Sequence, residues 1–206
     1  MDPALRTRRL ADSLKDVGFA STFVIMFGRV PFASLVVLGY LAMGCADLGR
    51  LSSGTPRLAL RGAAVLVAAA AVLPTVAVWV ENRWLAIGWV LAVGFVLLLL
   101  AVGLSGLAVE FGGALKWQRA RAAGVVAACA TSFIAGMLQQ ANTPRWGVHI
   151  GVPGGAGSWV AFVALFGSLS FIGIAWSDLR GRVKAAIVQS HAEAAAALAP
   201  SEHVRG

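Results

Sequence analysis

Long apolar runs separated by short polar connections dominate the pattern of this chain. Four runs, 59–80, 84–109, 122–141 and 157–176, each hold about twenty residues or more, the length that a helix needs to cross a bilayer. A fifth run, 17–45, is also long enough but is interrupted by Gly28, Arg29 and Pro31. The pattern predicts an all-α integral membrane protein with four secure transmembrane helices and an N-terminal membrane segment broken at residues 28–31, giving five spans if that segment crosses.

Composition agrees with this class and excludes an ordinary soluble domain. Of the 206 residues, 59% are hydrophobic and only 13% are charged, whereas soluble domains carry about a quarter charged residues. We expect three regions along the chain. Residues 1–16 form a basic cytoplasmic or interfacial N-terminus, residues 17–176 form one transmembrane helical domain, and residues 177–206 form an amphipathic helix followed by a disordered tail.

The basic residues predict how the spans are oriented. Arginine and lysine are more frequent in the connections 46–58 and 110–121 and in the tail after 176 than in the connections 81–83 and 142–156. Because cytoplasmic loops carry the excess of positive charge, the C-terminus is expected in the cytoplasm. Tryptophans are expected at the membrane interfaces: Trp79, Trp84, Trp146 and Trp159 outside, Trp117 and Trp176 inside. The composition, rich in alanine, glycine and arginine, suggests a multi-pass protein of a bacterial cytoplasmic membrane.

Three arrangements of residues 17–45 remain open. The run could cross once, with Arg29 facing the protein interior, since an arginine at the bilayer centre costs at least a few kcal/mol. Alternatively, residues 4–28 could lie along the cytoplasmic interface before a short membrane helix that begins near Pro31. In the third arrangement, helices over 18–27 and 31–44 enter the membrane and return as a re-entrant pair.

A few polar residues are candidates for functional or partner contacts. Glu110, at the end of the run 84–109, is either the counter-ion of Arg29 or an interfacial acid paired with the nearby bases Lys116, Arg119 and Arg121. The remaining candidates lie at the end of the run 122–141 and in the connection that follows it: Gln139, Gln140, Arg145, Trp146 and His149.

Catalytic, cofactor-binding and metal-binding residues are not predicted. The histidines, His149, His191 and His203, all lie outside the runs, so one chain cannot supply bis-histidine haem ligation within the membrane. Two cysteines are too few for a cysteine-rich zinc site, and we expect no disulfide between Cys45 and Cys129. The segment 103–106, Gly-Leu-Ser-Gly, is interpreted as a packing notch. Basic residues that flank membrane spans do not indicate nucleic-acid binding.

Small residues in the apolar runs indicate closely packed helices, as at Ala123, Gly124, Ala127 and Ala128. With so few polar groups, the sequence favours a non-catalytic integral membrane subunit or assembly partner of a larger membrane complex. Its expected partners are membrane lipids and other membrane protein subunits, or further copies of itself. An oligomeric channel or transporter is the first alternative, and a membrane enzyme acting on lipid or isoprenoid is the second.

Overall fold

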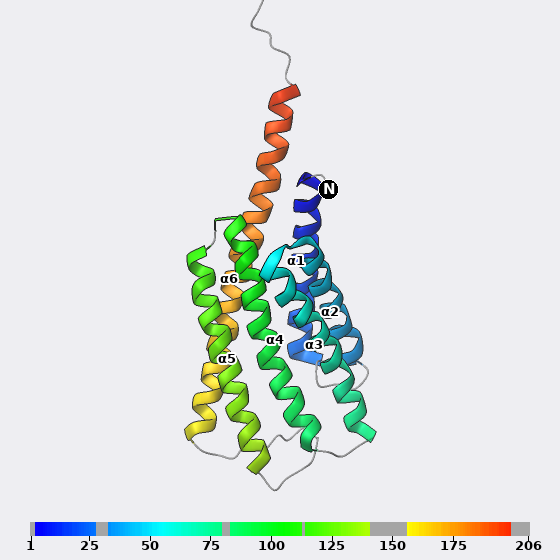
Figure 1. Cartoon of the computed structure of the whole chain (residues 1–206), viewed down its shortest axis with the longest axis vertical. Helices are drawn as coiled ribbons and strands as arrows, with labels where there is room; N and C mark the ends of the chain where they lie inside the picture. Colours follow the sequence, from blue (N-terminus) through cyan, green and yellow to red (C-terminus); the bar gives the residue numbers. More distant parts are fainter. Residues whose placement is uncertain (1–2, 28–32, 80–82, 113, 141–155, 199–206) are drawn as a thin grey trace, which may run out of the picture.

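The structure, a computed structural model, describes residues 3–27, 33–79, 83–112, 114–140 and 156–198, and these residues form six α-helices (Figure 1). The helices are α1 (Pro3–Phe27), α2 (Ala33–Leu51), α3 (Gly54–Trp79), α4 (Arg83–Glu110), α5 (Ala114–Gln140) and α6 (Ala156–Leu198). Five of them, α2 to α6, contain stretches long and apolar enough to cross a membrane. The expectation of an all-α membrane protein is therefore confirmed.

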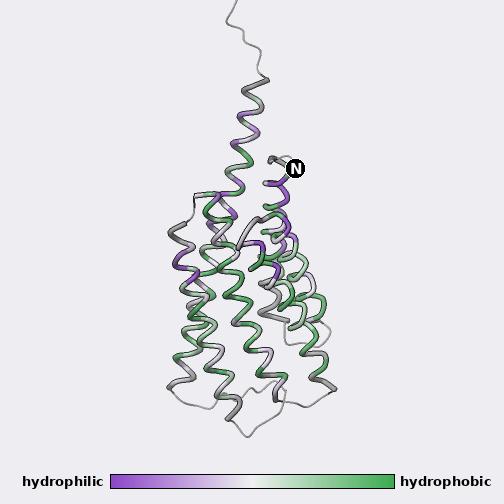
Figure 2. Tube along the Cα trace, viewed as in Figure 1, coloured by the Kyte–Doolittle hydropathy of each residue, from purple (hydrophilic) through white to green (hydrophobic). Residues whose placement is uncertain are grey.

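Each helix from α1 to α5 packs against the next one in the chain, and α1 also packs against α6. The start of α1, the α2–α3 turn and the α4–α5 turn all lie at one end of the bundle, and α6 continues beyond the bundle at this same end (Figure 1). Most of the hydrophilic residues of the described chain gather there (Figure 2). We call it the basic end, because it carries Arg6, Arg50, Arg57, Arg119 and Arg182.

The N-terminal apolar run does not cross the membrane as one helix. It is divided between α1 and α2, which run antiparallel: Arg6 Nε, near the start of α1, donates to the carbonyl of Leu51 at the end of α2 at 3.0 Å. A single straight crossing by residues 17–45 is therefore wrong, whereas the depth of α1 relative to the membrane interface stays a prediction. The third arrangement, a pair that enters and returns, agrees with the structure, although both helices extend beyond the bounds expected for it. Arg29 lies outside the described residues.

The α1–α2 pair ends short of the far end of the bundle (Figure 1). At the basic end α2 ends and α3 begins at their shared turn, but α2 has 19 residues and α3 has 26. At 1.5 Å per residue, these helices are about 28 Å and about 39 Å long. The pair therefore leaves the outer part of α3 without a covering helix on that side.

An apolar stripe explains why α1 joins the bundle despite its polar start. Leu10, Leu14, Val17 and Ala20, spaced three or four residues apart, are buried and belong to one core cluster with residues of α2, α3, α4, α5 and α6. Leu14 and Val17 have no exposed surface. The charged residues Arg8, Arg9, Asp12 and Lys15 are exposed. The helix is thus amphipathic, and its apolar side is covered by protein.

Glycines let α3, α4 and α5 approach closely. A Cβ added to Gly103 would lie 2.6 Å from Leu60 Cγ, and one added to Gly106 would meet the ring of Pro56. Both contacts are with α3, so the segment 103–106 is a packing notch, as predicted. On the other side of α4, a Cβ at Gly124 would lie 2.9 Å from Ala101 Cβ. Such small residues are a main basis of helix association in lipid, where no hydrophobic drive acts between helices.

The tryptophans follow the prediction only in part. Trp84 and Trp159, at the end opposite to the basic end, are 52% and 72% exposed, as expected of interfacial anchors. Trp117 has no exposed surface and belongs to the main core cluster, so it packs inside the bundle and is not an exposed anchor. Trp176 is half-buried and packs against Gly18 of α1. At the basic end, helix packing therefore covers the indole rings.

The arrangement of helices predicts which positions share a side of the membrane. With Cys45 and Cys129 replaced, single cysteines at Leu5→Cys, Ser53→Cys and His191→Cys should react alike with a membrane-impermeant maleimide. Gly157→Cys, near the start of α6 at the far end, should show the opposite accessibility. Labelling intact cells before and after lysis measures this. Reaction of Leu5→Cys together with Gly157→Cys would contradict the antiparallel α1–α2 pair.

The glycine contacts predict a difference between two positions of α5. Gly124→Ala should lower the free energy of unfolding by about 1–3 kcal/mol, because the new Cβ meets the rigid Cβ of Ala101 and, at 3.2 Å, the Cα of Leu98. Gly136→Ala is the matched control: nothing lies within 4 Å of its Cβ, so helix propensity alone should leave stability unchanged or raise it by up to about 1 kcal/mol. Thermal unfolding in mild detergent compares them; equal midpoints would contradict the close α4–α5 contact.

Candidate functional site

Arg6 joins three helices at the basic end. Its Nε donates to the carbonyl of Leu51, and its Nη2 lies 3.0 Å from Glu110 Oε2 at the end of α4. A cation near helix C-termini is favourable because the last carbonyls carry partial negative charge. The side chains of Arg6 and Glu110 are 37% and 38% exposed, so solvent weakens the attraction between them. The arginine therefore acts as a connection between helix ends, at the rim of the bundle.

A second arginine, Arg182 of α6, binds the backbone just after the end of α4. Arg182 of α6 donates from Nε to Asp178 at 2.8 Å and from Nη1 to the carbonyl of Gly112 at 3.2 Å. Gly112 has a φ of 77°, a left-handed conformation that favours glycine, and its N–H donates to the carbonyl of Val109. This contact ties the long helix α6 to the α4–α5 turn.

A third arginine connects α4 to α5. Arg121 Nε donates to the hydroxyl of Ser105, and that hydroxyl donates to the carbonyl of Val102 at 2.7 Å. Ser105 is 3% exposed. Because serine donates and accepts at once, the arginine stays anchored to the helix surface while most of its side chain remains exposed.

The described interior contains few polar groups, and most of them are satisfied locally. The buried polar residues are Ser34, Ser52, Ser105, Thr131 and Ser168. Apart from Ser34, each donates to a backbone carbonyl three or four residues earlier, at 2.7–3.0 Å. A hydrated pathway needs a continuous polar lining. The described part of one bundle does not provide such a lining.

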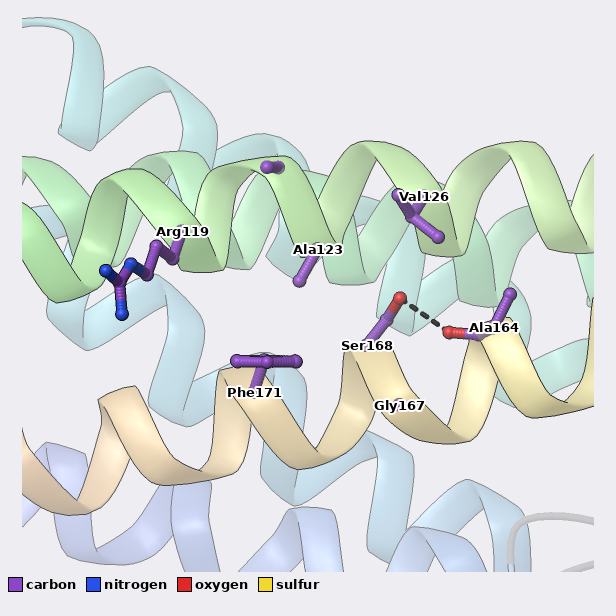
Figure 3. Close-up of a pocket in the computed structure, with 8 residues that line it drawn as sticks. Arg119, Ala123, Val126, Ala164, Gly167, Ser168 and Phe171 are labelled. Carbon is purple, nitrogen blue, oxygen red and sulfur yellow. Dashed lines mark hydrogen bonds between the residues drawn. The ribbon is translucent and has the colours of Figure 1, made fainter.

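A groove of about 390 Å³ lies between α5 and α6 (Figure 3). Small side chains form most of its wall: Ala122, Ala123, Ala164, Gly167 and Ser168. Val126 and Phe171 add larger apolar surface, and Arg119 lies at one end. The hydroxyl of Ser168 is turned to the carbonyl of its own helix at Ala164. The α5–α6 groove is therefore apolar along its length, with one cationic end.

The side of α6 that faces away from the bundle is the second surface feature. Its large apolar residues Val163, Phe166 and Ile174 are 69%, 63% and 63% exposed. Among them, Gly173, Ser177 and Gly181 follow one another at intervals of four residues, and all three are exposed. A Cβ at Gly173 or Gly181 would meet nothing within 4 Å. We call these three residues and their exposed apolar neighbours the α6 outer face.

Of the residues singled out from the sequence, only the side chain of Glu110 lies within the described part of the chain. Glu110 is paired with Arg6, which was not among its expected partners, while Arg119 and Arg121 make no ion pair with it. The side chain of Lys116 lies outside the described residues. Gln139 and Gln140 form the last turn of α5, but their side chains are outside the described residues. The same holds for the whole of Arg29, Arg145, Trp146 and His149. Cys45 and Cys129 are both free cysteines, as expected.

Sequence reasoning missed Arg6, Arg182 and the α5–α6 groove. One signal for Arg6 was present, because Arg6, Leu10, Leu14 and Val17 repeat at helical spacing and so share a face. Arg182 also has a local signal in Asp178, four residues earlier. The groove has no such signal, since it depends on how two helices pack.

Comparison with known proteins adds no identity: no protein-family model, curated protein or solved structure matches this chain.

The geometry at Arg6 predicts a weak but measurable coupling. In a double-mutant cycle, Arg6→Gln and Glu110→Gln should show a coupling energy of about 0.2–1 kcal/mol that falls as salt rises. Arg6→Gln alone should destabilise more than Glu110→Gln, because it also removes the bond to Leu51. The control cycle is Arg50→Gln with Asp47→Gln, a pair whose side chains are 73% and 52% exposed and which should couple less strongly. Equal single-variant effects would contradict the proposed bridging role of Arg6.

Proposed function

We propose that this protein is a non-catalytic integral membrane subunit that binds another membrane protein through the α6 outer face. The observation that carries the proposal is the contrast between two sets of glycines. Gly103, Gly106 and Gly124 each meet a neighbouring helix of the same chain, whereas Gly173 and Gly181 face open space. Exposed small residues four apart let the backbone of a second helix approach closely.

The spacing of the small residues supports a helix as the partner. Gly173, Ser177 and Gly181 recur every four residues, which forms a shallow groove along one side of α6. A protein helix gains van der Waals contact along the whole groove.

The interior supports a non-catalytic role. Most buried hydroxyls of the described residues bond to their own helices, and the charged pairs lie at the rim of the basic end. A conducting pathway or a lipid-modifying site therefore has little polar chemistry to draw on within the described bundle. The channel and enzyme alternatives gain no specific support from these residues.

The basic end is proposed to face the cytoplasm of a bacterial cell, with both termini on that side. The support is the gathering of Arg6, Arg50, Arg57, Arg119 and Arg182 at that end, since cytoplasmic ends of spans carry excess arginine and lysine. The net charge of +8 would attract this end to anionic lipid headgroups.

The proposal is tested by extracting the protein from native membranes in mild detergent or polymer nanodiscs. Wild-type protein should copurify with an unlike membrane protein, and Gly173→Leu should reduce that partner at least tenfold because the leucine fills the space for its helix. Gly39→Leu in α2 is the matched control, since nothing lies within 4 Å of Gly39 either. It should retain the partner.

Two results would contradict this proposal. One is a wild-type protein that purifies without any unlike subunit and conducts ions in liposomes, which would favour the channel alternative. The other is equal loss of the partner from Gly173→Leu and Gly39→Leu, which would show that the effect is not specific to the α6 outer face.

A further inference from the structure

The α5–α6 groove combines apolar walls with a single charged end. In Figure 3, Arg119 projects from α5 at one end of the groove, while Ala123 and Phe171 face the space between the two helices. The volume of about 390 Å³ lies within the range of about 300–1,000 Å³ that is typical of ligand pockets in proteins. A ligand that fits must therefore be apolar along most of its length and anionic at one end.

Arg119 has no counter-ion within the protein as described. It makes no hydrogen bond or ion pair with any described residue, and its side chain is exposed. Two acids of the basic end are occupied: Glu110 pairs with Arg6, and Asp178 pairs with Arg182. The neighbouring Arg121 is bonded to Ser105. The planar guanidinium of Arg119 is thus not occupied by any described residue, and phosphate matches its fork of donors.

The place of Arg119 along α5 fits a membrane phosphate. Arg119 lies in the second turn of α5, close to the α4–α5 turn, where the chain passes from the basic end into the apolar part of the bundle. Below it the groove continues between two helices that each contain a membrane-spanning stretch. Basic pockets between transmembrane helices on the cytoplasmic side are a common setting for anionic lipid headgroups.

We propose that the α5–α6 groove binds one acyl chain of an anionic phospholipid whose phosphate is held by Arg119. The small residues at the helix contact, Ala123, Ala164 and Gly167, leave the space that the chain fills, and Phe171 covers it near the headgroup. Gly173 of the α6 outer face lies outside this groove. Gly167 and Gly173 are six residues apart and so point about 120° apart around the helix.

The test uses the full chain in detergent, with native mass spectrometry of two lipids that have identical acyl chains, phosphatidylglycerol and phosphatidylcholine. Wild-type protein should bind phosphatidylglycerol at least fivefold more tightly. Arg119→Gln should remove that preference. Arg57→Gln is the matched control, because Arg57 is an exposed arginine of the basic end that also makes no ion pair with a described residue. It should keep the preference.

A second pair of variants tests the acyl-chain part of the site. Gly167→Leu should weaken binding of both lipids at least fivefold by filling the groove, and nothing within 4 Å of its Cβ obstructs folding. Gly173→Leu, outside the groove, should bind both lipids as wild type does. The proposal is overturned if Arg119→Gln keeps the preference, if Arg57→Gln loses it equally, or if both leucine variants bind alike. Loss of a protein partner in Gly173→Leu leaves these outcomes unchanged, so the two proposals are tested separately.

Discussion

Close approach of helix backbones at glycine is the constraint on which this bundle depends. In a bilayer, apolar side chains gain little by leaving lipid for protein, so the helices must be held by dense van der Waals contact. Gly103 and Gly106 admit α3 to one side of α4, and Gly124 admits α4 to α5. The turns at the basic end connect helices whose spacing is set by these contacts. Arg6, Arg121 and Arg182 add polar connections between those helices where water or headgroups are available.

Arginines at the basic end bind the C-terminal ends of helices that this packing brings together. Antiparallel neighbours bring the C-termini of α2 and α4 to the same end, and each leaves unpaired carbonyls with partial negative charge. Arg6 donates to Leu51 at the end of α2 and pairs with Glu110 at the end of α4, while Arg182 donates to Gly112 just beyond. Positive charge at this end therefore stabilises helix C-termini, in addition to its expected effect on the orientation of the chain in the membrane. Arg57 and Arg119 make no such contact with a described residue.

Much of the fold was predictable because hydropathy is a property of single residues summed along the chain. The runs beginning at 59, 84, 122 and 157 correspond to α3 to α6, but α5 begins at Ala114 and α6 continues to Leu198, well beyond the apolar runs. The α1–α2 pair stayed undecided, since the break at 28–31 is compatible with several backbone paths. The bond from Arg6 to Leu51 and the burial of Leu10, Leu14 and Val17 show that α1 folds back along α2. The pairing of Arg6 with Glu110 joins residues 104 positions apart, and nothing local in the sequence encodes it.

Trp117 shows why interface and interior are hard to separate from sequence. Its position near the α4–α5 turn was predicted correctly, but its burial depends on α4 and α6 closing over it. The same limit applies to the surface. A glycine that accommodates a neighbour, such as Gly124, and one that faces open space, such as Gly173, are alike in sequence and differ only in three dimensions. Since most buried hydroxyls of the described interior bond to their own helices, the proposed binding surfaces rest on this difference on the outside of α5 and α6. Helix and acyl chain are the two kinds of partner that such surfaces suit, because each fills a long, narrow space that leucine or phenylalanine would otherwise occupy.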